Sequence, residues 1–217
     1  MNAFIGAQQL FNKPLVEVAR EFGYKEDNLL VLEGNIQGLR ERFPETYNNI
    51  MSCVYHRDGR KALKYAQDLV ASWLVEDYFL KVLNNNDLKA KLAGADCNRK
   101  ILANVRTSTT SDFIVSYKGN SRKLELMNGY TDHWVEKNTL ELRDNKYISL
   151  KREGALFLAV SITTGEFALY DFREEIHARF ISFHFPYKKP AYQIDITAQM
   201  MEEATSHNIT EAIKRRL

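Results

Sequence analysis

Two carboxylates stand out in residues 111–130, SDFIVSYKGNSRKLELMNGY, because each lies within an alternation of apolar and polar side chains. Asp112 opens the first apolar run, and Glu125 lies in the middle of the second. An unpaired carboxylate in a half-buried strand is costly to desolvate, and two on adjacent strands repel each other. A divalent cation between them removes both penalties. Hard oxygen ligands favour magnesium, manganese or calcium, and such a metal serves phosphoryl chemistry. We expect Mg²⁺, with Mn²⁺ as a substitute.

A β-hairpin is expected to hold the two acids on neighbouring strands. Residues 113–117 and 123–127 alternate with the period of two that a strand requires, and KGNSR between them is rich in turn-forming residues. Upstream, residues 84–110 have no clear period, and we expect a helix there with a break at Gly94.

The segment after the hairpin predicts a helix and a central strand. Residues 145–153 have the features of a helix, with Asp144 as its N-cap and Gly154 just past its end. Residues 155–162, ALFLAVSI, are apolar on both faces, which is typical of a buried central strand. The remaining expected elements are strands at residues 167–172 and 178–185, and a helix at residues 209–217 with Thr210 as its cap.

The first 83 residues predict mostly helix, because apolar side chains recur at helical spacing. The expected helices are residues 12–22, 26–43, 45–55 and 60–83. We expect one domain with a helical N-terminal region, residues 1–58, and an α/β core, residues 59–217. The order of elements predicts a mixed central β-sheet flanked by helices.

Composition places the chain among compact globular proteins. It has 217 residues, 45% of them hydrophobic, and a net charge of +2, which neither demands nor excludes a nucleic-acid partner. Cys53 and Cys97 lack metal-ligand spacing and indicate free thiols in a reducing compartment. We expect a cytoplasmic, soluble protein with no membrane partner. The sequence contains no P-loop or GxGxxG motif, which predicts no nucleotide cofactor.

The hairpin resembles the metal-binding hairpin of the PD-(D/E)XK nuclease superfamily, especially of type II restriction endonucleases. The resemblance spans residues 60–172: a helix, then TTSDFIV and KLELMNGY with Asp112 and Glu125, then a helix–strand pair. It implies a magnesium-dependent, sequence-specific endonuclease that hydrolyses phosphodiester bonds of double-stranded DNA. Asp112 and Glu125 would be its catalytic metal ligands. Water would attack the phosphorus in line, leaving a 3′-hydroxyl and a 5′-phosphate.

The resemblance also implies an assembly. Enzymes that resemble this chain often act as homodimers, and a two-fold dimer matches a palindromic site. Residues 1–58 would supply dimerisation or DNA-embracing surface.

The sequence departs from the family pattern at the motif lysine, which polarises or deprotonates the attacking water. That position is Met127. Either the lysine has moved, with Lys146 as the best candidate, or the metal alone activates water, or activity is lost. Asn128 would orient water but is no base.

A second departure lies on the helix before the hairpin. Family members often carry a glutamate there, and its register falls on Gln67. The amide of Gln67 would hydrogen-bond a metal-bound water rather than ligate the metal. Glu76 and Asp77, further along the helix, are expected to lie on a solvated face.

Two segments carry candidate DNA contacts. In LRDNKY, Arg143 and Asn145 are either an exposed helix start or readers of guanine and adenine, since Arg and Asn are the usual major-groove readers of these bases. In HFPYKKPAYQ, residues 184–193, Lys188 and Lys189 either lie in a solvated loop or grip the DNA backbone.

Two alternatives to a restriction enzyme remain. One is another nuclease of the same fold, acting in phage or repair pathways, on DNA or RNA. The other is a catalytically decayed nucleic-acid-binding or interaction protein, marked by Met127 and Gln67. The direction of Lys146 discriminates, since a lysine more than roughly 10 Å from the acids has no hydrogen-bonded or water-bridged role.

Overall fold

The structure is a computed structural model that describes residues 3–52, 60–85, 87–94, 97–101, 110–131, 133–185, 188–196 and 202–217. The chain divides into two compact units, residues 1–78 with 96–107, and residues 79–95 with 108–217. The expected boundary after residue 58 falls outside the described residues, and the division between the units lies within helix α6.

The first unit is helical, as its sequence predicts. Its elements are α1 (Ala3–Phe11), α2 (Leu15–Glu21), α3 (Glu26–Glu33), α4 (Ile36–Arg42), α5 (Pro44–Ser52) and the greater part of α6 (Ala62–Asn84). The apolar face of α6 forms the core, and Val70, Trp73 and Leu74 are completely buried. The longest helix therefore buries apolar side chains, as the helical spacing of its apolar residues predicts.

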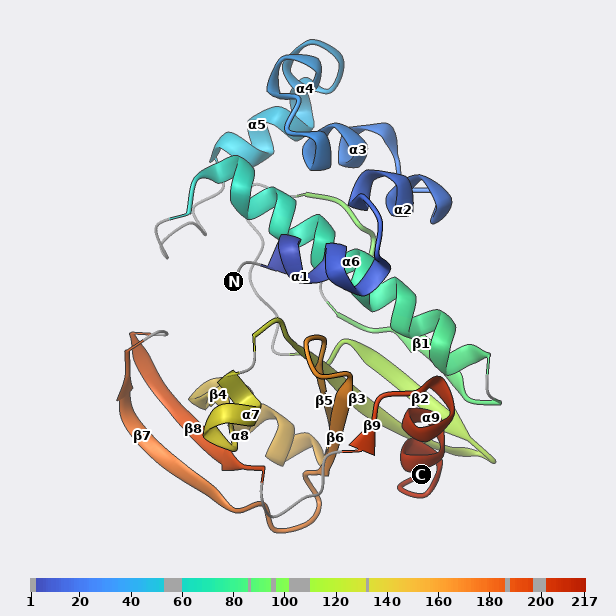
Figure 1. The fold of residues 1–217 in the computed structure, drawn as a ribbon, viewed down its shortest axis with the longest axis vertical. Coiled ribbons are helices and arrows are strands. Elements are labelled where there is room, and N and C mark those ends of the chain that lie inside the picture. Colours follow the sequence, from blue (N-terminus) through green and yellow to red (C-terminus); the bar gives the residue numbers. More distant parts are fainter. Residues whose placement is uncertain are drawn as a thin grey trace. The chain divides into compact units, whose positions relative to one another are not determined.

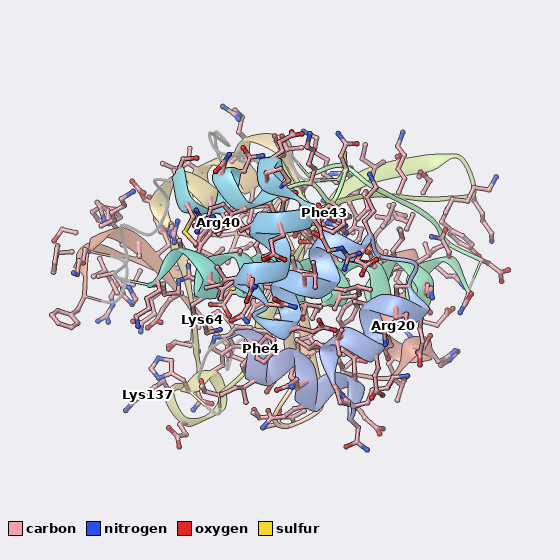
Figure 2. All side chains as sticks on the ribbon, turned by 90° about the horizontal axis from the view of Figure 1, so that it is seen from above. Phe4, Arg20, Arg40, Phe43, Lys64 and Lys137 are labelled. Carbon is pink, nitrogen blue, oxygen red and sulfur yellow. The ribbon has the colours of Figure 1, made fainter. Side chains whose placement is uncertain are left out.

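Helix α1 lies alongside α6 and was not expected from the sequence. The Lys64 ammonium group lies 5.2 Å from the centroid of the Phe4 ring, and both side chains are labelled in Figure 2. At the other end of α1, Phe11 meets Tyr78 edge to face with ring centroids 5.7 Å apart. Gly6 weakens the intrinsic helix propensity of this segment, so packing against α6 decides its conformation.

The single helix expected over residues 26–43 is two helices in the structure. Gly34 ends α3 in the left-handed conformation, with φ of +73°. Asn35 then caps α4, and its side-chain oxygen accepts a hydrogen bond from the Gly38 backbone N–H at 2.8 Å. A Gly–Asn pair therefore supplies both a helix stop and a helix start.

The second unit contains two β-sheets. The larger, sheet A, has the strand order β1-β2-β3-β5-β6-β9 (Figure 1). Its strands are β1 (Lys89–Leu92), β2 (Phe113–Tyr117), β3 (Asn120–Gly129), β5 (Leu156–Ser161), β6 (Glu166–Asp171) and β9 (Glu202–Glu203). Strands β3 and β5 are parallel, and the other neighbouring pairs are antiparallel. A parallel pair needs a crossover connection, which here contains a helix.

The smaller sheet, sheet B, is antiparallel with the order β4-β8-β7. Its strands are β4 (Thr139–Arg143), β8 (Lys189–Asp195) and β7 (Ala178–His184), and the helices of this unit are α7 (His133–Lys137), α8 (Asp144–Glu153) and α9 (Ser206–Lys214). Leu150 of α8 packs in one apolar cluster with Leu140 of β4 and Phe157 of β5. Helix α8 therefore joins the cores of the two sheets.

The chain has a mixed α/β fold, as the order of elements predicts. All six residues of β5 are buried, which confirms the expected central strand. The hairpin of β2 and β3 is also confirmed, although β3 runs over ten residues rather than the expected five. Within the described residues, no helix combines the length and the apolar character that a membrane crossing requires.

Strand β1 replaces part of the helix expected over residues 84–110. Lys89 and Lys91 are exposed while Ala90 and Leu92 are half-buried, which is the period of a strand. The Asn84 side chain donates to the Ala90 carbonyl at 3.1 Å and accepts from its N–H at 3.0 Å. Asn84 thus pairs with β1 and turns the chain out of α6.

Sheet B was only partly expected, because of its three strands only β7 was predicted. Residues 189–195 form β8, where a loop was considered. Two expected caps were also misplaced. Arg143 occupies the N-cap position of α8, with Asp144 as the first helical residue. Thr205, not Thr210, caps α9, and its hydroxyl accepts the Asn208 N–H at 3.0 Å.

Candidate active site

Asp112 directly precedes β2, and the hairpin brings it close to Glu125 of β3. Phe113 pairs with Leu124, so the next position of the antiparallel register sets Asp112 opposite Glu125. Two backbone contacts hold Asp112 in line with the sheet. Its carbonyl accepts the Ala93 N–H at 2.8 Å, and its Oδ2 accepts the Leu126 N–H at 2.8 Å. Because the Asp112 carboxylate bonds the backbone N–H of the residue after Glu125, the two acidic residues are neighbours in the fold.

Lys146 reaches this site from α8. Its Nζ lies 2.6 Å from Oε1 of Glu125. The Glu125 side chain is 10% exposed and that of Lys146 is 22% exposed, so the ion pair is screened from most of the solvent but open at one side. A lysine more than roughly 10 Å from the acids would have favoured the decayed protein, and Lys146 lies well within that distance of Glu125. The positive charge offsets part of the cost of placing two carboxylates on adjacent strands.

Helix α8 makes a second ion pair with β3, two residues before Glu125. Lys123 pairs with Glu153 at 3.0 Å, on the same face of β3 as Glu125 and from the same helix as Lys146. Residues 146 and 153 are seven apart, which is close to two helical turns, so both side chains leave α8 on one side. Helix α8 therefore makes two ion pairs with one face of β3.

Met127 shares the face of Glu125, because side chains alternate along a regular strand. It is partly buried against the apolar cluster of α8, β4 and β5. Asn128 follows it and therefore points to the opposite face, with Leu124 and Leu126. Its Oδ1 atom is buried without a hydrogen-bond partner among the described residues. The structure brings Met127, but not Asn128, to the face that carries Glu125.

Gln67 lies in the helical unit. Its Nε2 donates to the Leu32 carbonyl at 3.4 Å, at the end of α3. The two acids considered on the same helix, Glu76 and Asp77, are not solvated as the sequence predicted. Both pair with Arg99, at 2.7 Å and 2.5 Å, and their side chains are each 18% exposed. The prediction was wrong because Arg99, more than twenty residues away, is returned to this helix by the tertiary fold.

The candidate DNA contacts occupy two places in the second unit. Arg143 and Asn145 are exposed at the end of β4 and the start of α8, on either side of Asp144. The backbone N–H of Asn145 donates to Asp144 Oδ1 at 2.7 Å. Lys188 and Lys189 are exposed where β7 turns into β8. Their side chains have the solvent access that a phosphate contact requires.

The donor set suits magnesium when part of the coordination comes from elsewhere. Mg²⁺ is often held by one or two carboxylates, with waters and substrate phosphates completing the octahedron. Asp112 and Glu125 supply two such oxygen donors on adjacent strands. Within the described residues, no cluster of three or more His, Cys, Asp or Glu side chains has metal-site geometry. The residues present therefore fit a substrate-assisted magnesium site and do not fit an all-protein cage.

A buried ion pair on the other face of β3 was missed by sequence reasoning. Both terminal nitrogens of Arg122 donate to the two oxygens of Asp171, at 2.5 Å for the Nη1 bond, and they also reach the Gly154 carbonyl at 2.5 Å and the Arg216 carbonyl at 3.1 Å. The available signal was an arginine at a position that alternates with Leu124 and Leu126.

A second missed group surrounds Glu141 on β4. His133 Nε2 lies 3.6 Å from its Oε2, and His184 Nε2 lies 3.4 Å from its Oε1. The three residues are too far apart in sequence to have suggested a cluster.

A hollow of about 410 Å³ lies on sheet B. Its lining includes Thr139, Arg179 and Gln193 but none of the residues of the acid–lysine site.

No protein-family model matches the chain, and no curated protein matches it in sequence.

Proposed function

We propose that this chain is a magnesium-dependent, sequence-specific endonuclease of double-stranded DNA, similar to type II restriction enzymes of the PD-(D/E)XK superfamily. The observation that carries the proposal is the 2.6 Å contact between Lys146 and Glu125, opposite Asp112. A lysine beside two carboxylates is the constellation that the resemblance requires, with the lysine moved from position 127 to α8. The order of a helix, the β1–β3 strands, a helix and strand β5 also supports it.

In this proposal, Asp112 and Glu125 hold the metal, which when bound would activate water and neutralise charge on the scissile phosphate. Glu125 keeps Lys146 directed at the site. The ammonium group then positions the attacking water or stabilises the negative charge that develops on phosphorus. Arg143 and Asn145, which are exposed at the start of the same helix, would contact phosphates or base edges. A homodimer on a palindromic site and action in the cytoplasm belong to the proposal.

A binding protein without activity is the second candidate, and one observation favours it. The Lys146–Glu125 pair by itself neutralises a buried carboxylate, as a purely structural ion pair would. The two candidates differ in what magnesium does, because a structural pair needs no metal.

The test is cleavage of a long unmethylated DNA, with excess magnesium or with EDTA. We expect discrete fragments that require magnesium and disappear in Asp112→Ala. Glu153→Gln is the matched control, because it removes a carboxylate of the neighbouring ion pair and should leave the fragments unchanged. A metal-dependent smear would instead indicate a nuclease without sequence specificity. No cleavage of DNA or RNA with magnesium or manganese, by a folded protein, would overturn the enzyme proposal in favour of the binding protein.

A further inference from the structure

Strand β7 and Phe185, the residue that follows it, expose an unusual amount of aromatic surface. Phe180, Phe183 and Phe185 are 54%, 61% and 80% exposed, although phenylalanine is usually buried. The order of sheet B places β7 at its edge. Singly exposed apolar side chains need no explanation, but three exposed phenylalanines within six residues indicate an interaction surface.

One of these rings is already held in an orientation suited to stacking. Phe180 meets Tyr192 of β8 at a centroid distance of 5.3 Å, and Tyr192 stacks on Tyr147 of α8 at 3.9 Å with an interplanar angle of 13°. The aromatic row therefore begins in the packed core and ends in solvent at the sheet edge. Rings anchored in this way lose little conformational entropy when a planar partner binds.

The charge around these phenylalanines selects the class of partner. Residues 178–191, ARFISFHFPYKKPA, contain one arginine and two lysines and no aspartate or glutamate. Arg179, Lys188 and Lys189 are exposed. Aromatic rings among cations on a β-surface are what proteins use to stack the bases and neutralise the phosphates of a nucleic-acid strand.

The same strand is poorly suited to pairing with a second copy of the chain. Its register with β8 shifts between Ile181 and His184, opposite Pro190, which has no N–H to donate. Such a bulge bends and twists the edge, and bulges of this kind protect sheet edges from adding another strand.

We infer that the β7–β8 hairpin binds single-stranded DNA, with Phe180, Phe183 and Phe185 stacking on unpaired bases and Lys188 and Lys189 contacting phosphates. This inference goes beyond the proposed endonuclease activity, because it requires neither metal nor cleavage. In a nuclease, such a surface would hold bases unstacked next to the cut duplex. In a binding protein, it would be the principal contact with the strand.

The test is fluorescence anisotropy of a labelled thymidine oligonucleotide and of the matched duplex, in EDTA so that no cleavage occurs. We expect tighter binding of the single strand. Removing two stacking rings in Phe183→Ser/Phe185→Ser should weaken binding by at least about tenfold, and Phe183→Tyr/Phe185→Tyr should retain most of it. Ile36→Ser, which removes an exposed apolar side chain from α4, is the control and should leave affinity unchanged.

The phosphate contacts have their own readout. Lys188→Ala/Lys189→Ala should reduce the slope of log affinity against log salt by about 1.4, the value expected for two contacts to a single strand. Lys89→Ala/Lys91→Ala removes two exposed lysines from the edge strand β1 and should leave the slope unchanged.

Three outcomes would overturn the inference. The first is equal affinity of Phe183→Ser/Phe185→Ser and wild type for the single strand. The second is tighter binding of the duplex than of the single strand. The third is a change of oligomeric state in the serine variant with unaltered DNA affinity, which would assign the exposed phenylalanines to self-association. Each is measured without activity, so the endonuclease proposal can fail while the inference stands, and the reverse also holds.

Discussion

Strand β3 carries an ion pair on each face, and the two differ in how completely they are enclosed. Arg122 and Asp171 are 2% and 9% exposed, and the arginine also bonds two backbone carbonyls. Lys146 and Glu125 are 22% and 10% exposed, and a second carboxylate, Asp112, lies across the ladder from the glutamate. The first arrangement is closed and holds sheet A to the C-terminal segment. The second combines an excess of negative charge with an opening to solvent, which is what a cation and a phosphate need.

The largest expected effect separates the Lys146–Glu125 pair by function from the Lys123–Glu153 pair on the same face of β3. Lys146→Met should reduce cleavage by about 100- to 10,000-fold, the range for removing a group that assists proton transfer. Lys123→Met, which removes a lysine paired to the same helix, should leave cleavage near the wild-type rate. The measurement is the rate of fragment appearance under magnesium saturation. Equal losses in the two variants would mean that the Lys146 pair is only structural.

A rescue experiment sharpens the same contrast. In the Lys146→Met background, Met127→Lys places an ammonium group on the face of Glu125, at the position that the motif lysine holds in nucleases of the proposed family. We expect part of the cleavage rate to return, limited by the cost of placing a charge against the apolar cluster that Met127 contacts. An unchanged rate in a double variant with the stability of the single variant would argue against a migrated lysine.

The closed pair should dominate stability. Arg122→Ala leaves Asp171 buried without its partner and should lower the free energy of unfolding by about 3–5 kcal/mol, because an uncompensated buried charge remains. For a chain of this size, that corresponds to a fall in Tm of roughly 10 °C. Thermal unfolding by circular dichroism checks it. If Arg122→Ala lowers the free energy of unfolding no more than Lys123→Met does, the Arg122–Asp171 pair does not dominate stability.

Gly129 tests the end of β3. A Cβ atom at this position would meet the Trp134 ring at 2.8 Å, so Gly129→Ala forces the indole or the strand to shift. We expect a loss of about 1–3 kcal/mol, typical of overpacking in a core. Urea unfolding measures this loss. Gly119→Ala is the contrast, because a Cβ atom at Gly119 meets no atom within 4 Å and the substitution costs only the backbone strain of a φ of +87°. A stability equal to wild type would contradict the close contact.

The smallest effect is a pH dependence of the closed pair. Burial alone would raise the pKa of Asp171, but the hydrogen bonds and charge of Arg122 outweigh it and hold that pKa below its ordinary value. A carboxyl group with a depressed pKa contributes stability above its unfolded pKa, and this contribution is lost as pH falls through the folded pKa. The stability difference between wild type and Arg122→Ala should therefore shrink as the pH falls below the ordinary aspartate pKa of about 4 and through the lower pKa of the folded protein. A constant difference would exclude Asp171 as the titrating group.

The sequence alone determined the local features near the candidate site. Alternation predicted the β2–β3 hairpin, and the two-sided apolar run predicted the buried strand β5, because both signals reside in neighbouring side chains. The acids were found because carboxylates interrupt those patterns. Lys146 was named only as a candidate, since the sequence could not show whether the start of α8 faces β3.

Tertiary structure decided what depends on distant partners. Helix α8 crosses from β4 to lie on β3, and this crossing, not any local signal, places Lys146 beside Glu125. Arg122 could be recognised as a structural residue only once Asp171, forty-nine positions away, lay opposite it. Sheet B and its exposed phenylalanines were hidden for the same reason. Strand pairing and burial are properties of contacts between remote segments, and the free energy that selects them is absent from any short window of sequence.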